Sequence, residues 1–143
     1  MDNHNTPIRR FFDAFAHNSD KGNVPELVAC FADVFLAAGL HGAQPVRASD
    51  FARVLPKRCK MFESMGCKST ELISIQENWL DAQHAAVRTR WRLTFVRPEM
   101  EALPIEVDST YLIDAGREPF RILMYLPHSD IMEVLKQHGI APA

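Results

Sequence analysis

The polar side chains in this sequence that could do chemistry fall at apolar positions of predicted strands. Ser109 and Tyr111 lie on the apolar face of one strand, Thr89 lies beside Trp91 in another, and Glu77 alternates with large apolar residues in a third. A polar side chain that is buried must find a hydrogen-bond partner or a ligand. These positions therefore predict a pocket in which an apolar wall carries a few polar groups.

Glu77 is the candidate for a catalytic carboxylate. It shares a predicted strand face with Ile73, Ile75 and Trp79. Burial among such side chains would raise the pKa of the carboxyl toward neutrality, where it could act as a general base. A one-residue slip in strand register would instead place Glu77 on an exposed face, and the sequence leaves both alternatives open.

Tyr111 is the second catalytic candidate, because its hydroxyl could donate a hydrogen bond to a ligand carbonyl. A core ring whose hydroxyl reaches a backbone group is the structural alternative. The predicted ligand-binding side chains are mostly large and apolar, as is usual for pockets of small molecules. They are Phe11, Phe15, Trp79, Trp91, Ser109 and Met124, and for the two tryptophans simple packing in the core is the alternative.

Metal and disulfide chemistry have little support. The six histidines include no pair at helical ligand spacing, and the three cysteines have no short paired spacing. We therefore expect reduced thiols, no metal site and no cofactor. His41 and His128 are expected at or next to loops, where a histidine could titrate near neutral pH at a pocket mouth or remain an ordinary surface residue.

Composition limits the class of protein. With 143 residues, of which 47% are hydrophobic and 24% charged, the chain is expected to form a single domain over residues 1–143. The net charge of −2, without a basic cluster, argues against a nucleic-acid partner. The longest apolar run, Val34 to Leu40, is far shorter than the roughly 20 residues of a membrane span, and Met1 to Thr6 is polar. We expect a cytoplasmic protein that does not bind membranes.

The N-terminal part predicts helices. Thr6 is a suitable N-cap, Pro7 suits the first helical position, and a second helix is expected from Asn23. The segments that follow are a short strand at 33–38, a loop at 39–46, and a third helix from Ser49 to Gly66, kinked or divided at Pro56.

From Lys68 onward the apolar period changes from helical to alternating. Strands are predicted at 71–80, 84–97, 103–114 and 120–126, followed by a short helix after Ser129. In the second strand Arg88, Arg90 and Arg92 alternate with apolar residues and should face the acids of the third strand. A solvated ladder of ion pairs is the main interpretation, and a subunit interface is the alternative.

The order of these elements resembles that of the NTF2-like superfamily, in particular its SnoaL-like branch. Four segments are similar to recurring segments of that superfamily: 31–33 (FAD), 44–46 (QPV), 86–95 (AVRTRWRLTF) and 119–126 (PFRILMYL). The resemblance implies an α+β, cone-shaped (cystatin-like) barrel, in which a curved antiparallel sheet wraps around three N-terminal helices and a short C-terminal helix follows. It also implies a pocket between sheet and helices, and a homodimer.

Two chemistries known in that superfamily do not transfer to this sequence. The position of the ketosteroid isomerase base falls at Ala38 or Gly39, its tyrosine falls near Phe11, and its second oxyanion donor falls near Ser109. The epoxide hydrolases of this fold need an Asp, Arg, Asp set inside the cone, whereas the arginines of the 84–97 strand are predicted to face outward.

Two functions remain open at this point. One is binding of a small hydrophobic molecule in the cone pocket, including a lyase, isomerase or cyclase reaction on it. The other is a non-catalytic dimeric interaction or scaffold module. The second would use a sheet face formed by Arg88, Arg90, Arg92, Leu112, Leu123 and Tyr125.

Overall fold

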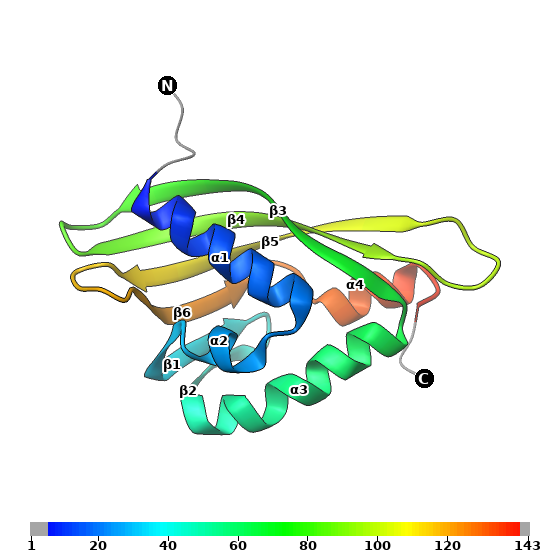
Figure 1. Cartoon of the computed structure of the whole chain (residues 1–143), viewed down its shortest axis with the longest axis horizontal. Coiled ribbons are helices and arrows are strands. Elements are labelled where there is room, and N and C mark those ends of the chain that lie inside the picture. The colour runs from blue at the N-terminus through cyan, green and yellow to red at the C-terminus, as the bar shows by residue number, and fades with distance from the viewer. Residues whose placement is uncertain (1–5, 141–143) are drawn as a thin grey trace.

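The computed structural model of the chain describes residues 6–140, which form one six-stranded sheet and four helices (Figure 1). Of the polar segment Met1 to Thr6, residues 1–5 lie outside the described part. The helices are α1 (Pro7–Lys21), α2 (Val24–Val28), α3 (Ala48–Ser64) and α4 (Ile131–Gln137). The strands are β1 (Phe31–Gly39), β2 (Gly42–Arg47), β3 (Cys67–Trp79), β4 (His84–Phe95), β5 (Leu103–Asp114) and β6 (Arg121–Pro127).

The sheet has the strand order β2-β1-β6-β5-β4-β3 and is antiparallel except where β1 pairs with β6. It is curved and does not close on itself, and the helices pack against it (Figure 1). Helix α3 contacts both edge strands, β2 and β3. It therefore spans the open side of the sheet, and the predicted α+β architecture is confirmed.

Helix α1 begins and ends as the sequence predicts. The Thr6 Oγ1 accepts a hydrogen bond from the Arg9 amide at 3.0 Å, and Gly22 ends the helix with φ 68°. Ile8, Phe12 and Phe15 are buried against the sheet. The bulky apolar stripe of this helix therefore supplies the centre of the core.

Helix α3 is a single helix that passes through Pro56, so of the two predicted alternatives, a kink or a division at this proline, the division is wrong. It begins one residue before the predicted cap Ser49. The helix packs on β1, β2 and β3 along its length, and this packing outweighs the backbone hydrogen bond that a proline removes. Gly66 follows with φ 97°, and a Cβ there would lie 2.6 Å from the Val96 carbonyl oxygen, so the turn requires glycine.

The predicted loop at 39–46 is wrong, because most of it forms the edge strand β2. This strand pairs with β1 from Gly42 to Arg47, and all of its residues except Val46 are exposed. No alternation of buried and exposed residues therefore marks it in the sequence. Pro45 is tolerated because an edge strand has an unpaired side.

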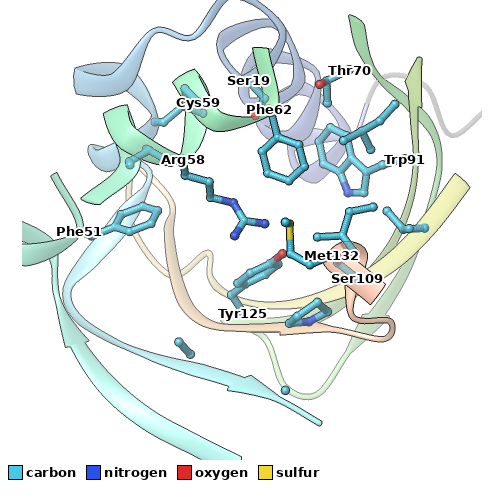
Figure 2. Close-up of a pocket in the computed structure, with 18 of the residues that line it drawn as sticks. Ser19, Phe51, Arg58, Cys59, Phe62, Thr70, Trp91, Ser109, Tyr125 and Met132 are labelled. Carbon is cyan, nitrogen blue, oxygen red and sulfur yellow. The ribbon is translucent and has the colours of Figure 1, made fainter. Parts of the chain in front are cut away.

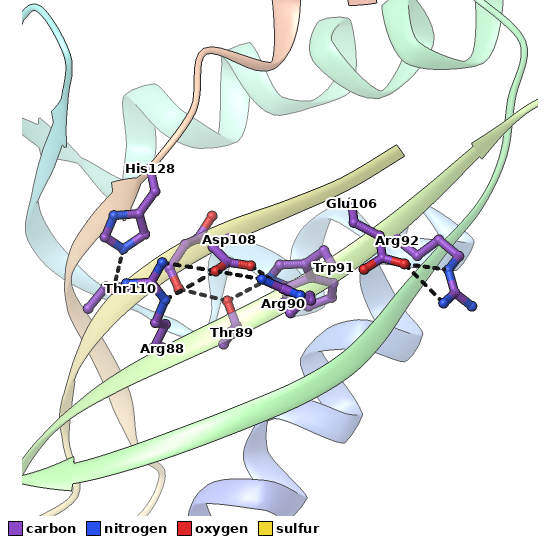
Figure 3. A network of polar contacts seen from close by, with 10 residues as sticks. Arg88, Thr89, Arg90, Trp91, Arg92, Glu106, Asp108, Thr110 and His128 are labelled. Carbon is purple, nitrogen blue, oxygen red and sulfur yellow. Dashed lines mark hydrogen bonds and ion pairs between the residues drawn. The ribbon is translucent and has the colours of Figure 1, made fainter. Parts of the chain in front are cut away.

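The two faces of β4 and β5 are confirmed as predicted. Val87, Thr89 and Trp91 are buried on the helix side. On the other side Arg88 and Arg90 both pair with Asp108 at 2.9 Å, and Arg92 pairs with Glu106 at 3.1 Å (Figure 3).

No helix within residues 6–140 is both long and apolar enough to cross a membrane, and Cys30, Cys59 and Cys67 are free thiols.

Candidate functional site

A cavity of about 1090 Å³ lies between α3 and the inner face of the sheet. Its wall is largely aromatic and aliphatic, with contributions from α1, α3, β4 and β6 (Figure 2). The residues that define it best are Phe15, Phe51, Leu55, Phe62, Trp91 and Tyr125. The cavity exists because α3 holds the two edges of the sheet apart.

The aromatic wall is held by ring contacts. The Tyr111 and Tyr125 rings stack with centroids 5.1 Å apart, and Phe15 contacts Tyr111 at 5.7 Å and Trp91 at 6.1 Å. Such offset and edge contacts fix ring orientation as well as burying area. Phe15 and Trp91, both predicted as ligand-binding residues, therefore lie in the cavity wall.

Trp91 is further fixed by a buried hydrogen-bond chain. Its Nε1–H donates to the Thr89 Oγ1 at 2.7 Å, and that hydroxyl donates to the Ser109 carbonyl oxygen at 3.0 Å (Figure 3). Thr89 thus has protein partners for its hydroxyl and needs no ligand, although its position on an apolar face suggested one. The chain holds the indole against the cavity.

Ser109 and Tyr111 line the cavity as predicted. Within residues 6–140 no protein group hydrogen-bonds either side-chain hydroxyl. Burial raises the pKa of Tyr111 well above its usual range, the neighbouring Tyr125 adds to this rise, and the charge of Arg58 opposes it. Tyr111 is therefore a neutral phenol at physiological pH, able to donate a hydrogen bond into the cavity.

Arg58 is a cavity residue that the sequence analysis missed. Its guanidinium carbon lies 5.0 Å from the centroid of the Phe62 ring, and the side chain points into the cavity toward Tyr125 (Figure 2). No carboxylate within residues 6–140 forms an ion pair with it. Arg58 is an exposed residue of the lining, so within residues 6–140 its charge is balanced by solvent rather than by a carboxylate.

A signal for Arg58 was present in the sequence. Leu55, Cys59 and Phe62 recur at helical spacing, and Arg58 falls on the same helical face. A charged residue inside an apolar stripe is the helical equivalent of the polar residues singled out on the strands.

Glu77 and Trp79 do not line the cavity. Glu77 is on the helix side of β3 and half-buried, but its Oε2 accepts from the Thr6 hydroxyl at 2.6 Å and its Oε1 accepts from the Trp79 Nε1–H at 3.2 Å. Trp79 is 47% exposed. The prediction that these residues face a ligand is therefore wrong, because the start of α1 occupies that part of the sheet.

Phe11 and Met124 are also placed elsewhere. Phe11 packs on Phe12 and on Phe120 beside a separate small surface pocket.

In β6 the pairing shifts between Leu112 and Ile113, which leaves one extra residue in the strand. This bulge reverses the alternation, so that Tyr125 lines the cavity and Met124, predicted to bind ligand, faces away.

Most carboxylates around the cavity have structural partners. Asp20 accepts from the Thr70 amide at 2.9 Å, Asp130 caps α4, and Asp108 pairs with two arginines. Glu63 and His41 are exposed residues of the lining. Within residues 6–140 no three His, Cys, Asp or Glu side chains are grouped so that they could hold a metal ion.

Neither a family model nor a curated protein matches this sequence. Solved structures do match its fold. An NTF-2 like protein of unknown function from Shewanella oneidensis aligns over 86% of this chain and 97% of its own, with a TM-score of 0.69 and 13% identity.

The chain has the NTF2-like, cystatin-like fold. A candidate scytalone dehydratase from Novosphingobium aromaticivorans aligns over 84% of this chain and 79% of its own (TM-score 0.65, 11% identity). The beta subunit of benzoate 1,2-dioxygenase from Burkholderia mallei aligns over 87% and 89% (TM-score 0.63, 15% identity). This NTF2-like fold therefore occurs in enzymes and in components of enzymes, and the narrower SnoaL-like assignment stays a prediction.

Proposed function

We propose that this NTF2-like protein binds a small, largely apolar molecule in its cone cavity. The observation that carries the proposal is an aromatic cavity of about 1090 Å³, a volume near the upper end of the range usual for small-molecule sites. Its rings are held by packing and by the Trp91–Thr89–Ser109 chain, so little ordering is needed on binding. The free hydroxyls of Ser109 and Tyr111 would orient the ligand.

Binding is favoured over a lyase, isomerase or cyclase reaction because a proton acceptor is scarce. Asp20, Asp108 and Asp130 are occupied by backbone amides or arginines. Glu63 and His41 remain as exposed candidates for a general base. A reaction in this cavity would have to use one of them, and replacing each in turn would reveal it.

The two tryptophans provide a direct test. Trp91 is in the cavity wall and Trp79 lies outside the cavity, so the two indole N–H signals of an ¹⁵N-labelled sample report on different places. Titration with the neutral probe N-phenyl-1-naphthylamine should shift the Trp91 signal in a saturable manner and leave that of Trp79 in place. A Trp91 signal that does not move at the solubility limit of the probe would contradict the proposal.

A homodimer is the second candidate, on the outer face of the sheet. Register places Leu36 beside Met124, and Met124 beside Leu112, so that three apolar side chains are adjacent next to the arginines of β4. A mixed apolar and arginine surface suits a protein interface. Sedimentation of the wild type against a Leu112→Asp variant would test it, with a dimer that dissociates in the variant as the expected result and a wild-type monomer as the contrary one.

The three free thiols also support the predicted cytoplasmic location, where cysteines stay reduced.

A further inference from the structure

Arg58 is a basic side chain of α3 that is turned into the cavity. Arg53 pairs with Asp50 on the surface of the same helix, and Lys57 and Lys60 are exposed outside the cavity lining. Arg58 lines the cavity but is itself an exposed residue, as Lys57 and Lys60 are, so its guanidinium stays hydrated until a ligand covers it. Within residues 6–140 Arg58 has no acidic partner.

Among residues 6–140 no group accepts a hydrogen bond from the Arg58 guanidinium, so its donors are available to a ligand. The guanidinium carbon lies over the Phe62 ring, 5.0 Å from its centroid, and the side chain points toward Tyr125 (Figure 2). A cation–π contact of this kind does not use up the N–H donors at the edge of the guanidinium. Two parallel donors at the edge of a guanidinium match the two oxygens of a carboxylate.

Glu63 is an exposed lining residue of the same helix, but within residues 6–140 it forms no ion pair with Arg58, and three other nearby acids are already occupied. Asp20, Asp108 and Asp130 are engaged with other groups. The lining also includes two exposed lysines, Lys21 and Lys68, of which Lys21 pairs with Asp20 at 3.9 Å. Arg58 differs from these lysines in lying over an aromatic ring, and the planar donor edge of a guanidinium matches a carboxylate better than an ammonium does.

We propose that the molecule bound in the cavity is a small organic monocarboxylate with an apolar, ring-sized body. Its carboxylate binds the Arg58 guanidinium, and its body packs against Trp91 and Phe51. This inference rests on the proposed function, because it specifies the chemical class of the ligand for the same cavity.

The test compares two probes of the same shape, 2-naphthoic acid and its neutral amide, 2-naphthamide. At pH 7 and fixed ionic strength, calorimetric or fluorescence titration should give the acid about tenfold or more tighter binding than the amide, the ratio expected for one charge-assisted pair. The Arg58→Gln variant should bind both probes with equal affinity. Lys57→Gln removes the same charge from the outer side of α3 and should keep the preference for the acid.

The outcomes separate the two proposals. If the wild type binds both probes equally and the Trp91 indole signal shifts, the proposed function stands and the carboxylate inference is overturned. If Arg58→Gln keeps the preference for the acid, another group binds the carboxylate and the inference is also overturned. If neither probe binds, the proposed function itself fails. Should Arg58→Gln unfold, Arg58→Lys gives the same test, with a reduced preference for the acid as the expected result.

Discussion

Arginine side chains occupy two contrasting regions of this molecule. On the outer face of the sheet Arg88, Arg90 and Arg92 are paired with Asp108 and Glu106. Inside the cone Arg58 lies over Phe62 without an acidic partner in the described chain. The outer arginines are explained by the fold, since they pair across β4 and β5. The inner arginine forms no such pair within residues 6–140, and the proposed ligand would supply its partner.

The largest effect is expected on the inner face of β4. Trp91→Ala should lower the free energy of unfolding by about 3–5 kcal/mol, because the indole is 5% exposed and its removal leaves a void among packed rings. Arg90→Ala, one residue away on the outer face, should lower it much less, because the ion pair of Arg90 with Asp108 is exposed to solvent. Urea unfolding of both variants measures the contrast, and similar losses would contradict the assignment of the two faces.

The next effect concerns the buried hydrogen-bond chain. Thr89→Val keeps the shape of the side chain but leaves the Trp91 Nε1–H buried without an acceptor, so a loss of about 1–3 kcal/mol is expected. The same substitution in a Trp91→Phe background should cost clearly less, because that donor is already absent. Equal costs in the two backgrounds, measured by urea unfolding, would show that the chain does not hold the indole.

A smaller effect is expected for the ion pairs outside. The hydrogen bond from Arg90, helped by Arg88, holds the pKa of Asp108 below its ordinary value of 3.8. The associated stability is therefore present above pH 3.8 and is lost as the pH falls through the lower pKa of the folded protein. Asp108→Asn should cost about 1 kcal/mol or less at pH 7 and should weaken the loss of stability on acidification. Acid unfolding curves that coincide for variant and wild type would contradict this.

The smallest effect on stability is expected at Arg58. Arg58→Met should change the free energy of unfolding by about 0.5 kcal/mol or less, because no ion pair is lost and the thioether can still pack on Phe62. A loss as large as that of Thr89→Val would mean that Arg58 supports the fold, and its role would then be structural. Thermal or urea unfolding of the variant without ligand measures this.

The sequence predicted the sheet well where burial alternates. In β4 and β5 one face is apolar and the other charged over many residues, so their register and the ion pairs between them could be predicted. Strand β2 could not be predicted, because both of its faces are exposed and Pro45 indicated a loop. The bulge in β6 also could not be predicted, because no residue pattern indicates it. As a result of this bulge Tyr125 lines the cavity, whereas the sequence predicted Met124 there.

The candidate site was predicted only in part for a related reason. Phe15, Trp91, Ser109 and Tyr111 follow from strand and helix periodicity and do line the cavity. Glu77 lies on the predicted face of its strand, but the start of α1 covers it. The position of this helix over the sheet depends on tertiary packing and could not be predicted from the sequence. Arg58 was overlooked because charged residues on a helix usually face water.

A crystal structure of the protein with 2-naphthoic acid would test the central claim most directly. The account predicts the ligand in the cone cavity, with its carboxylate oxygens about 2.7–2.9 Å from the Arg58 guanidinium nitrogens and its rings against Trp91. A carboxylate bound instead by Arg88 or Arg90 on the outer face, with the cavity empty, would contradict it.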